Sequence, residues 1–292
     1  MHEEHKEIAV LYHGGCPDGL GGAYAAWKKF GDATEYIPAK HGRPAPDGLA
    51  GRTLYFIDFC YPQEIMDAIV AEAKSVTVLD HHLGTKEIVQ SMPHFVFDAN
   101  RSGATIAWSY FHPDTPVPTL LQYIADGDLY RFELPDSRAI LAYAYTSPLL
   151  ASSFEDWDVF VAEMENDKER ERIIHTGSLF NQYHEHIISN AVRHAELVTF
   201  EGYECYLVCA TGEFKSDVGH TLVEQKPPIA LIVSVDATEM QVSLRSDKTV
   251  DVAAIARKYG GNGHPAAAAF RVRFGEKVPW TPIEKENENP RD

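Results

Sequence analysis

The tripeptide Asp80, His81 and His82 is the part of this sequence best suited to do chemistry. It directly follows the apolar run 76–79, and a short β-branched run with this ending predicts a buried strand that delivers polar side chains at its C-terminal tip. In open α/β sheets, active sites lie at such strand tips. Imidazole nitrogen and carboxylate oxygen are both ligands for divalent cations, so the tripeptide predicts a metal site.

Three further apolar segments end in the same kinds of side chain. Each is followed by one or two acids, or by an acid and a histidine: His13 and Asp18 after residues 8–12, Asp58 after 53–57, and Asp126 and Asp128 after the helical stretch 120–125. Side chains at the tips of neighbouring parallel strands converge, so these groups are expected to share one cluster of metal ions. An acidic loop at any one tip would be ordinary, but the same ligand chemistry at every tip favours the cluster.

The chain resembles the DHH phosphoesterase superfamily, which takes its name from this tripeptide. The resemblance covers most of the chain and continues, in the family's order, in residues 243–246, 252–256 and 260–270. The last of these segments is similar to the Gly-Gly-Gly-His signature of the DHH-associated C-terminal domain. A set of motifs in this order is far more specific than a lone glycine-rich loop.

The resemblance implies an α/β fold with two domains. We expect a parallel-sheet DHH catalytic domain with a helical extension over residues 1–190 and a smaller α/β substrate-binding domain over 196–276, with the active site in the cleft between them. Residues 167–193 have little Gly and no Pro, which is typical of a long connecting helix. Residues 277–292 are expected to form a polar tail, disordered from 280 onward.

Apolar runs and helical periodicity predict the remaining elements. Further strands are expected at 94–97, 196–200, 203–209, 229–236 and 241–245. Helices are expected at 19–30, 62–73, 104–111, 217–224 and 252–259. The first half of the chain therefore alternates strands with helices, as a parallel sheet requires.

The resemblance also assigns metal ligands. Family members hold two divalent ions, usually manganese, bridged by a carboxylate, which implies that Asp58 is the bridge. His13 would hold one ion, and the other would be held by Asp18, His81 and Asp126. A pair of ions stabilises both the attacking and the leaving oxygen of an in-line displacement.

Asp80 and His82 are the expected catalytic side chains beside these ligands. A carboxylate that accepts a hydrogen bond from a ligand histidine fixes its tautomer and ring angle, which is the role expected of Asp80. His82 would lie beside the phosphate and donate a hydrogen bond or a proton. An alternative role for Asp80 is to cap the turn that follows it.

Cys16 departs from the family pattern, whose first motif reads Asp-x-Asp-Gly where this chain reads Cys16, Pro17, Asp18 and Gly19. A thiolate ligand would shift the preference from manganese toward zinc or iron. A neutral thiol would instead leave water to complete the coordination. Both alternatives stay open, and Cys16 is not counted among the expected ligands.

Two groups of residues are expected to bind the substrate. In the first domain, Arg101 and Ser102 precede the helix expected to start near residue 104, where N–H groups and a guanidinium would bind phosphate. In the second domain, the family places a substrate-binding arginine at a strand end, which here is Arg245.

The glycine-rich loop after residue 259 completes the expected substrate site. Gly261 and Gly263 would let the backbone approach a phosphate closely, and His264 would donate to it. Gly260 or Gly261 is also suited to cap the preceding helix in the left-handed conformation, and the two roles are compatible.

The net charge of −17, from 26 Lys and Arg against 43 Asp and Glu, limits the partners. It repels a long polyanion, and no block of consecutive Lys or Arg forms the basic stripe of proteins that track DNA or RNA. Residues 168–172 alternate bases with acids and predict an exposed, ion-paired helix face. A small nucleotide or short oligonucleotide is therefore expected as partner, and long nucleic acid is not.

Other features favour a soluble, cytoplasmic protein without a membrane partner; a homo-oligomer is compatible with them. No run approaches the ~18 apolar residues of a membrane span, and the N-terminal residues lack the apolar stretch of a secretory signal. The four cysteines, at 16, 60, 205 and 209, have neither zinc-finger nor disulfide-framework spacing.

The resemblance thus implies a metal-dependent phosphoesterase that hydrolyses short oligonucleotides or small nucleotide phosphodiesters to mononucleotides. A cyclic-dinucleotide phosphodiesterase or a small-nucleotide phosphatase is the alternative with the same ions. A pyrophosphatase is less favoured because such relatives lack the glycine-rich histidine motif. The acidic charge weakens a RecJ-type single-strand exonuclease, and the retained ligands weaken a non-catalytic nucleotide sensor.

Overall fold

The computed structural model describes residues 6–146 and 153–283. The chain divides into two compact units, with the boundary between Asn181 and Gln182. This boundary lies inside the long helix α8 (Asp167–Arg193), which was expected over the same residues. None of the helices in the described residues combines the length and the apolar content needed to cross a membrane.

The first unit is built on a five-stranded sheet in the order β2-β1-β3-β4-β5. Its strands are β1 (Ile8–His13), β2 (Thr34–Ala39), β3 (Thr53–Ile57), β4 (Ser75–Asp80) and β5 (His94–Phe97). All neighbouring strands pair in parallel, so their carboxyl ends lie at one edge of the sheet. His13, Asp58 and Asp80 lie at this edge.

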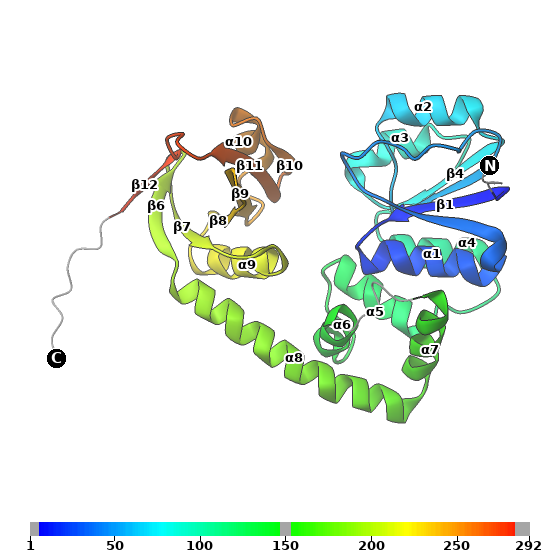
Figure 1. The fold of residues 1–292 in the computed structure, drawn as a ribbon. Coiled ribbons are helices and arrows are strands. Elements are labelled where there is room, and N and C mark those ends of the chain that lie inside the picture. The colour runs from blue at the N-terminus through cyan, green and yellow to red at the C-terminus, as the bar shows by residue number, and fades with distance from the viewer. Residues whose placement is uncertain (1–5, 147–152, 284–292) are drawn as a thin grey trace. The chain divides into compact units, whose positions relative to one another are not determined.

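Helices cover both faces of this sheet (Figure 1). One face carries α2 (Gln63–Glu72) and α3 (Lys86–Gln90), and the other carries α1 (Pro17–Phe30) and α4 (Gly103–Phe111). Along β1, Ala9 and Leu11 pack in the core on the α2 face, whereas Val10 packs in the core on the α1 face. Burial on both faces explains why the strand is a continuous apolar run.

Three more helices and the first part of α8 complete the first unit: α5 (Thr119–Asp128), α6 (Ser137–Thr146) and α7 (Phe154–Glu165). Leu121, Ile140 and Phe160 from these helices join the core beneath α1 and α4. Helix α8 approaches α6 closely at Gly177, where a Cβ would lie 1.9 Å from the carbonyl oxygen of Ala139.

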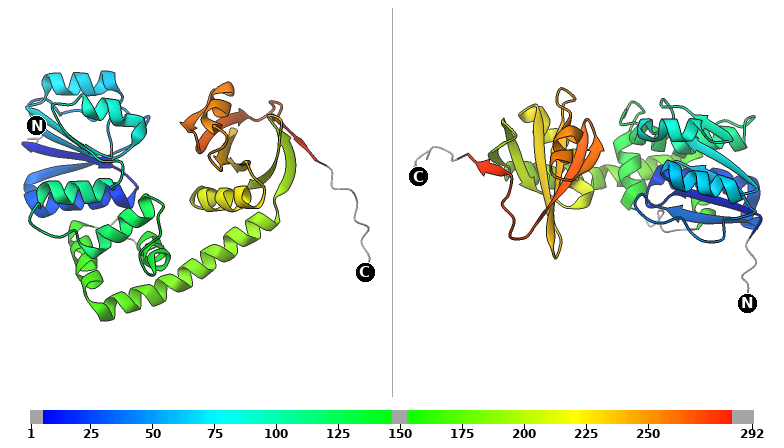
Figure 2. Two further views of the ribbon diagram at one scale, coloured as in Figure 1. Left: turned by 180° about the vertical axis from the view of Figure 1, so that it is seen from behind. Right: turned by 90° about the horizontal axis from the view of Figure 1, so that it is seen from above.

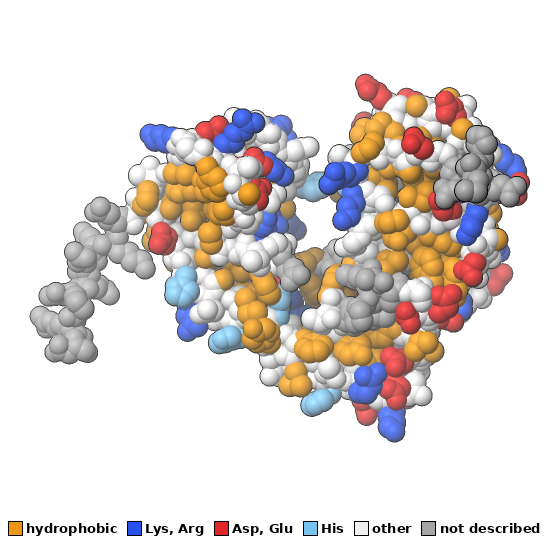
Figure 3. Space-filling view, in the orientation of Figure 1, with side chains coloured by type: hydrophobic (Ala, Val, Ile, Leu, Met, Phe, Trp, Pro, Cys, Tyr) orange, Lys and Arg blue, Asp and Glu red, His pale blue; other side chains and the backbone are white. Residues whose placement is uncertain are grey.

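The ion-paired helix face expected at residues 168–172 is confirmed. Arg170 pairs with Asp167, and Arg172 lies 2.9 Å from Glu169 and 3.2 Å from Glu163 of α7. Figure 3 shows acidic and basic side chains close together where α7 meets α8. These cations neutralise local acids, so they are not available to a polyanion.

The second unit holds a seven-stranded sheet in the order β10-β11-β9-β8-β7-β6-β12. Its strands are β6 (Glu196–Phe200), β7 (Tyr203–Cys209), β8 (Ile229–Val235), β9 (Glu239–Ser246), β10 (Asn262–His264), β11 (Ala267–Arg273) and β12 (Trp280–Pro282). β7 and β8 pair in parallel, and the other described pairs are antiparallel. Helices α9 (Lys215–Gln225) and α10 (Val252–Lys258) lie on opposite faces (Figure 2).

Strand β12 corrects the expectation of a disordered tail from residue 280. Trp280 pairs with Phe200 and Pro282 with Val198, so β6 is not an edge strand. Trp280 also packs against the core under α10, which explains why a polar, Pro-containing segment joins the sheet. Residues 284–292 of the expected tail lie outside the described residues.

Candidate metal centre

Side chains at the carboxyl edge of the first sheet converge on Asp58. Its Oδ2 lies 3.3 Å from Nδ1 of His13, at the end of β1. Its Oδ1 lies 3.2 Å from Nε2 of His81 and 3.6 Å from Nδ1 of His82, which both follow β4. Asp58 is 1% exposed, so one buried carboxylate faces three imidazoles.

Asp18 borders the same cluster from the first turn of α1. Its Oδ2 lies 3.9 Å from Nε2 of His81. Its two oxygens also accept hydrogen bonds from the backbone N–H groups of Gly103 (2.6 Å) and Ala104 (3.0 Å). Position 103 must be glycine, because a Cβ there would lie 2.5 Å from the Cβ of Asp58. Asp18 therefore caps α4 as well as facing a ligand histidine.

The N-terminus of α4, where a phosphate site was expected at Arg101 and Ser102, makes hydrogen bonds within the first unit. Asp18 occupies its first N–H groups, and the buried Ser102 accepts from the N–H of Thr105. The guanidinium of Arg101 donates to the carbonyl of Thr105 and to Oγ of Ser109. These polar groups bind one another in the structure, and substrate binding by Arg101 and Ser102 stays a prediction.

Asp128, rather than the expected ligand Asp126, joins the cluster. Oδ2 of Asp128 lies 3.4 Å from Nε2 of His81. Asp126 instead accepts hydrogen bonds from the N–H groups of Glu133 (3.0 Å) and Leu134 (3.2 Å), and so fixes the loop after α5. Both acids lie in the last turn of α5, where two positions along a helix rotate the side chain by about 200°. The assignment of Asp126 as a ligand is therefore corrected to Asp128.

Asp80 holds His82 in place at the end of β4. Its Oδ1 accepts from the N–H groups of His81 (2.7 Å) and His82 (3.2 Å) and lies 2.7 Å from Nδ1 of His82. Its Oδ2 accepts from the hydroxyl of Thr85 at 2.8 Å. Asp80 thus has both alternative roles, as a cap and as the partner of an imidazole, but that imidazole is His82 and not the expected ligand His81.

Three groups of side chains bring their ligand atoms within 4.8 Å of one another. They are His13, Cys16 and Asp58; Asp18, His81 and Asp128; and Asp58, Asp80, His81 and His82. Asp58 belongs to two of these groups, as a bridging carboxylate would. The mixture of imidazole and carboxylate donors suits a divalent cation.

The electrostatics of the cluster also fit a bound cation. Burial, followed by the charge of Asp58, raises the pKa of both Asp18 and Asp128. Burial would also raise the pKa of Asp58, but hydrogen bonds with His13 and His81 outweigh it and lower that pKa to about 2. A divalent ion among these carboxylates would favour the ionised form of each and relieve their mutual repulsion.

Cys16 lies in the group with His13 and Asp58, next to the N-terminus of α1. Burial, and then the charge of Asp58, raises the pKa of its thiol to about 12. The thiol is therefore neutral unless a cation lies beside it. Its position makes Cys16 a candidate ligand, which the sequence left open.

His41 is a neighbour of the cluster that the sequence analysis missed. Its ring lies 5.6 Å from the ring of His13 and 4.7 Å from that of Phe59. The available signal was the run of Lys40, His41 and Arg43, which is basic in an otherwise acidic chain.

In the second unit, the side chain of Arg245, on β9, packs against helix α9. Its guanidinium donates to Oγ of Ser216 (3.1 Å) and to the carbonyl of Leu244 (3.0 Å). Gly219 of α9 makes room for it, because a Cβ there would lie 2.6 Å from Cγ of Arg245. Burial, then the charge of Arg245, lowers the pKa of Lys215, so two cations lie close together on this unit.

Gly260 ends α10 in the left-handed conformation, with a φ of 72°. The N–H of Gly260 donates to the carbonyl of Arg257, and the N–H of Gly261 donates to that of Ala256. The expected cap is therefore confirmed at Gly260.

The two glycines expected to contact phosphate pack against β11. A Cβ at Gly261 would lie 2.1 Å from the carbonyl oxygen of Ala269, and one at Gly263 would lie 2.4 Å from Cα of Ala268. His264 is exposed and pairs with Ala267 across the β10–β11 hairpin. Close packing thus explains both glycines, and phosphate binding by this loop stays a prediction.

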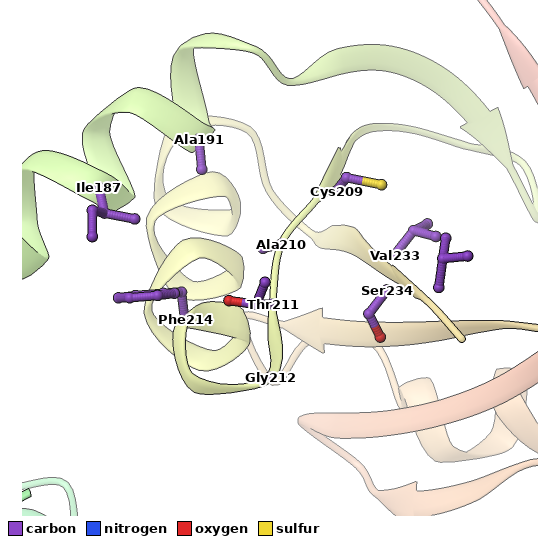
Figure 4. A pocket seen from close by; sticks show the side chains of 10 residues that line it. Ile187, Ala191, Cys209, Ala210, Thr211, Gly212, Phe214, Val233 and Ser234 are labelled. Carbon is purple, nitrogen blue, oxygen red and sulfur yellow. The ribbon is translucent and has the colours of Figure 1, made fainter. Parts of the chain in front are cut away.

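A pocket of about 670 Å³ lies within the second unit, away from these residues (Figure 4). Its lining is mainly apolar: Ile187, Ala191, Cys209, Ala210, Thr211, Gly212, Phe214, Val233, Ser234 and Val235. None of these described lining residues is a cation, so the lining side chains offer no charge-assisted hydrogen bond to a phosphate.

Comparison with known proteins supports the sequence-based expectation of family. The DHHA1 domain model matches residues 216–279. The uncharacterized protein R106 of Acanthamoeba polyphaga mimivirus is 30% identical over 286 residues, which cover 89% of this chain and 66% of that protein. The chain thus spans just under two thirds of the length of this relative.

Solved structures share the fold at low identity. A DHH-domain structure, described as that of a member of a family of ribosomal proteins, has a TM-score of 0.61 and 13% identity, over 92% of this chain and 83% of that one. A pGpG-specific phosphodiesterase from Vibrio cholerae has a TM-score of 0.52 and 14% identity, over 92% of this chain and 94% of that one.

The chain thus combines a parallel α/β unit that carries Asp80, His81 and His82 at a strand tip with a DHHA1 domain in the second unit. Residues 216–279 match the DHHA1 domain, and the chain shares its fold with a DHH-domain structure, so the comparisons support the DHH superfamily. The expected family and the expected α/β fold class are therefore confirmed.

Proposed function

We propose that this protein is a phosphodiesterase that depends on divalent metal and hydrolyses short oligonucleotides or small nucleotide phosphodiesters to mononucleotides. The observation that carries the proposal is the convergence of two groups of ligand side chains, one including His13 and the other His81, around Asp58. Membership of a phosphoesterase superfamily supports it.

Two ions, with manganese as the first choice, would be held by five side chains: His13, Asp18, Asp58, His81 and Asp128. When bound, the ions supply Lewis acidity at the phosphoryl group and at the attacking water. Cys16 as a further ligand would favour a softer metal, so activity is compared in manganese and in zinc.

His82 is the residue proposed to move a proton. The hydrogen bond between its Nδ1 and Oδ1 of Asp80, at 2.7 Å, is the main cause that raises the pKa of His82 to about 9. This hydrogen bond favours the imidazolium form of His82, and Nε2 is left to donate to a phosphate or leaving oxygen. The side chain of His82 is 37% exposed, so a substrate has access to it.

Charge and fold support a short substrate. The net charge of −17 opposes the binding of a long strand. Lys215 and Arg245, which lie close together in the second unit, would bind a few phosphates at most. The Vibrio cholerae protein of similar fold is described as specific for pGpG, which supports a dinucleotide here. The four cysteines are free in the structure as described, which supports a cytoplasmic location.

The test is a turnover screen, in manganese and then in zinc, with a dinucleotide, a twenty-mer, a cyclic dinucleotide and mononucleotides at equal concentration. We expect the dinucleotide to be cleaved fastest, with rates that fall as the oligomer lengthens past a few nucleotides. Equal or faster cleavage of the twenty-mer would favour an exonuclease, and preference for the cyclic substrate or for mononucleotides would favour the corresponding alternative. Nucleotide binding without turnover in either metal would identify a sensor and overturn the proposal.

A further inference from the structure

In the first unit, Arg101 donates hydrogen bonds to its own helix, and other basic side chains lie near the metal centre. The segment after β2 supplies three basic side chains within four positions: Lys40, His41 and Arg43. None of the metal-ligand groups uses these side chains.

The sheet places this segment beside the metal centre. β2 pairs in parallel with β1, and Ala39 lies opposite His13 at the carboxyl ends of the two strands. The N–H of Gly14 donates to the carbonyl of Ala39 at 2.8 Å, which ties the end of β2 to the loop after His13. Gly42, with a φ of 76°, then turns the chain.

Distances confirm that the segment borders the cluster on its His13 side. The ring of His41 lies 5.6 Å from the ring of His13, whose Nδ1 faces Asp58 at 3.3 Å. Nζ of Lys40 lies 3.8 Å from the position that a Cβ on Gly15 would take. Lys40 and His41 therefore lie beside the His13 side of the cluster, and Arg43, whose N–H donates to the carbonyl of Lys40, follows in the same turn.

Lys40 and Arg43 are exposed and are not engaged elsewhere. In the ranges that the structure covers, neither side chain makes a hydrogen bond or an ion pair, whereas Lys28 is paired with Asp158 and Arg52 with Glu35. Two uncompensated cations beside a cluster of acids are suited to bind an anion that arrives with the substrate.

We propose that Lys40, His41 and Arg43 bind a second, terminal phosphate of the substrate, so that the enzyme selects dinucleotides that carry one. The inference rests on the proposed function and adds a substrate class to it. A phosphate monoester carries up to two negative charges, which the two cations would balance, and three acceptor oxygens for their donors and for His41. A dinucleotide without a terminal phosphate lacks this partner.

The experiment compares three dinucleotides of the same bases: one with a 5′-phosphate, one with a 3′-phosphate and one with neither. The wild type is compared with Lys40→Gln, Arg43→Gln and the control Lys29→Gln. Lys29 is an exposed lysine in the last turn of α1, ~16 Å along that helix from Asp18, and its loss changes the net charge equally.

We expect the wild type to prefer one phosphorylated dinucleotide, which identifies the end that is read. Lys40→Gln and Arg43→Gln should each lower kcat/KM on that substrate by roughly ten- to hundredfold, mainly through KM. Both variants should cleave the unphosphorylated dinucleotide as fast as the wild type does. The control Lys29→Gln should match the wild type on the phosphorylated and the unphosphorylated dinucleotides. Equal losses on all three substrates would overturn the inference, because the cations would then act on the scissile group.

Equilibrium binding separates this inference from the proposed function. The dissociation constants of the same dinucleotides, made with a non-hydrolysable linkage, are measured for every variant. If the wild type binds the phosphorylated form more tightly and Lys40→Gln and Arg43→Gln remove that advantage, the inference holds even where turnover is absent. If the terminal phosphate gives no advantage in binding, the inference fails whether or not the protein is an enzyme.

Discussion

Nδ1 of His13 lies 3.3 Å from Oδ2 of Asp58, on the side of that carboxylate opposite to His81. The strand order explains this arrangement, because β3 lies between β1 and β4 in the sheet. The residue after β3 is therefore the one that reaches histidines from both neighbouring strands. Its φ of 57° lies in the left-handed region, where Asp is tolerated better than most residues.

The first prediction concerns this shared carboxylate. Asp58→Ala and Asp58→Asn should both lose bound metal and lower kcat at saturating manganese by at least roughly a thousandfold, because each would remove the carboxylate proposed to serve both ions. Asn tolerates a positive φ, so it separates the loss of the ligand from backbone strain. Metal content and initial rate are measured beside the exposed control Asp47→Ala; near-normal turnover in Asp58→Asn would contradict the bridging role.

The second prediction separates Asp128 from Asp126. Asp128→Asn should weaken metal binding and turnover, because its carboxylate lies beside His81. Asp126→Asn should instead lower the free energy of unfolding by about 1 kcal/mol, the usual net worth of a hydrogen bond, and leave the metal content unchanged. Metal titration and urea unfolding of both variants provide the test. A reversed pattern would restore Asp126 as the ligand.

Much of the first sheet could be predicted, because buried parallel strands are apolar runs that end in polar residues. The strands ending near residues 12, 57, 79 and 97 were found in this way and are confirmed. β2 was missed because it is an edge strand that contains Glu35 and Pro38 and carries no apolar run. Missing β2 also hid the basic segment that follows it.

The site was harder to predict where long-range contacts decide which groups are used. Asp18 caps a helix that begins 85 positions further along the chain, so the sequence could not show that the N-terminus of α4 is already occupied. Likewise, the motif after residue 125 holds two acids, and its spacing alone does not tell which one faces His81. Only the rotation of α5 decides between Asp126 and Asp128.

The third prediction concerns proton transfer by His82. His82→Gln should retain metal and lower kcat by ~10²–10⁴-fold, the usual effect of removing a general acid. Asp80→Asn should lower kcat less, because His82 keeps its place but loses the charged partner at 2.7 Å that favours the imidazolium. Rates and metal content are measured together. Loss of metal in His82→Gln would identify His82 as a ligand and remove its role as the acid.

The fourth prediction concerns pH and the packing of α7 on α1. Oδ1 of Asp158 accepts hydrogen bonds from Lys28 (2.8 Å) and Tyr24 (2.6 Å), and these two partners lower the pKa of Asp158. A carboxyl group whose pKa is lower in the folded state stabilises the fold at pH values above its pKa in the unfolded state, ~3.9. This stabilisation is lost as the pH falls through the pKa of the folded state.

Asp158→Asn should therefore lower the free energy of unfolding at pH 7 by about 1 kcal/mol, a modest value because the carboxylate is 44% exposed. The difference from the wild type should shrink as the pH falls below ~4. Urea unfolding at pH 7 and pH 3 measures both values, with Glu155→Gln on the same helix as the control. A difference that is independent of pH would show that the carboxylate charge does not contribute.

The last prediction separates capture of the substrate from chemistry. Arg245 belongs to the second unit, and its guanidinium is bound only to Ser216 and to a backbone carbonyl in the described contacts. If it binds a substrate phosphate, Arg245→Ala should keep full metal occupancy while kcat/KM on a dinucleotide falls by roughly ten- to hundredfold. Bis-p-nitrophenyl phosphate, which needs the metal centre alone, should lose much less. Arg273→Ala, an exposed arginine at the end of β11, is the matched control and should leave both activities unchanged. Equal losses on both substrates, or loss of metal with Arg245, would show that this arginine does not capture the substrate.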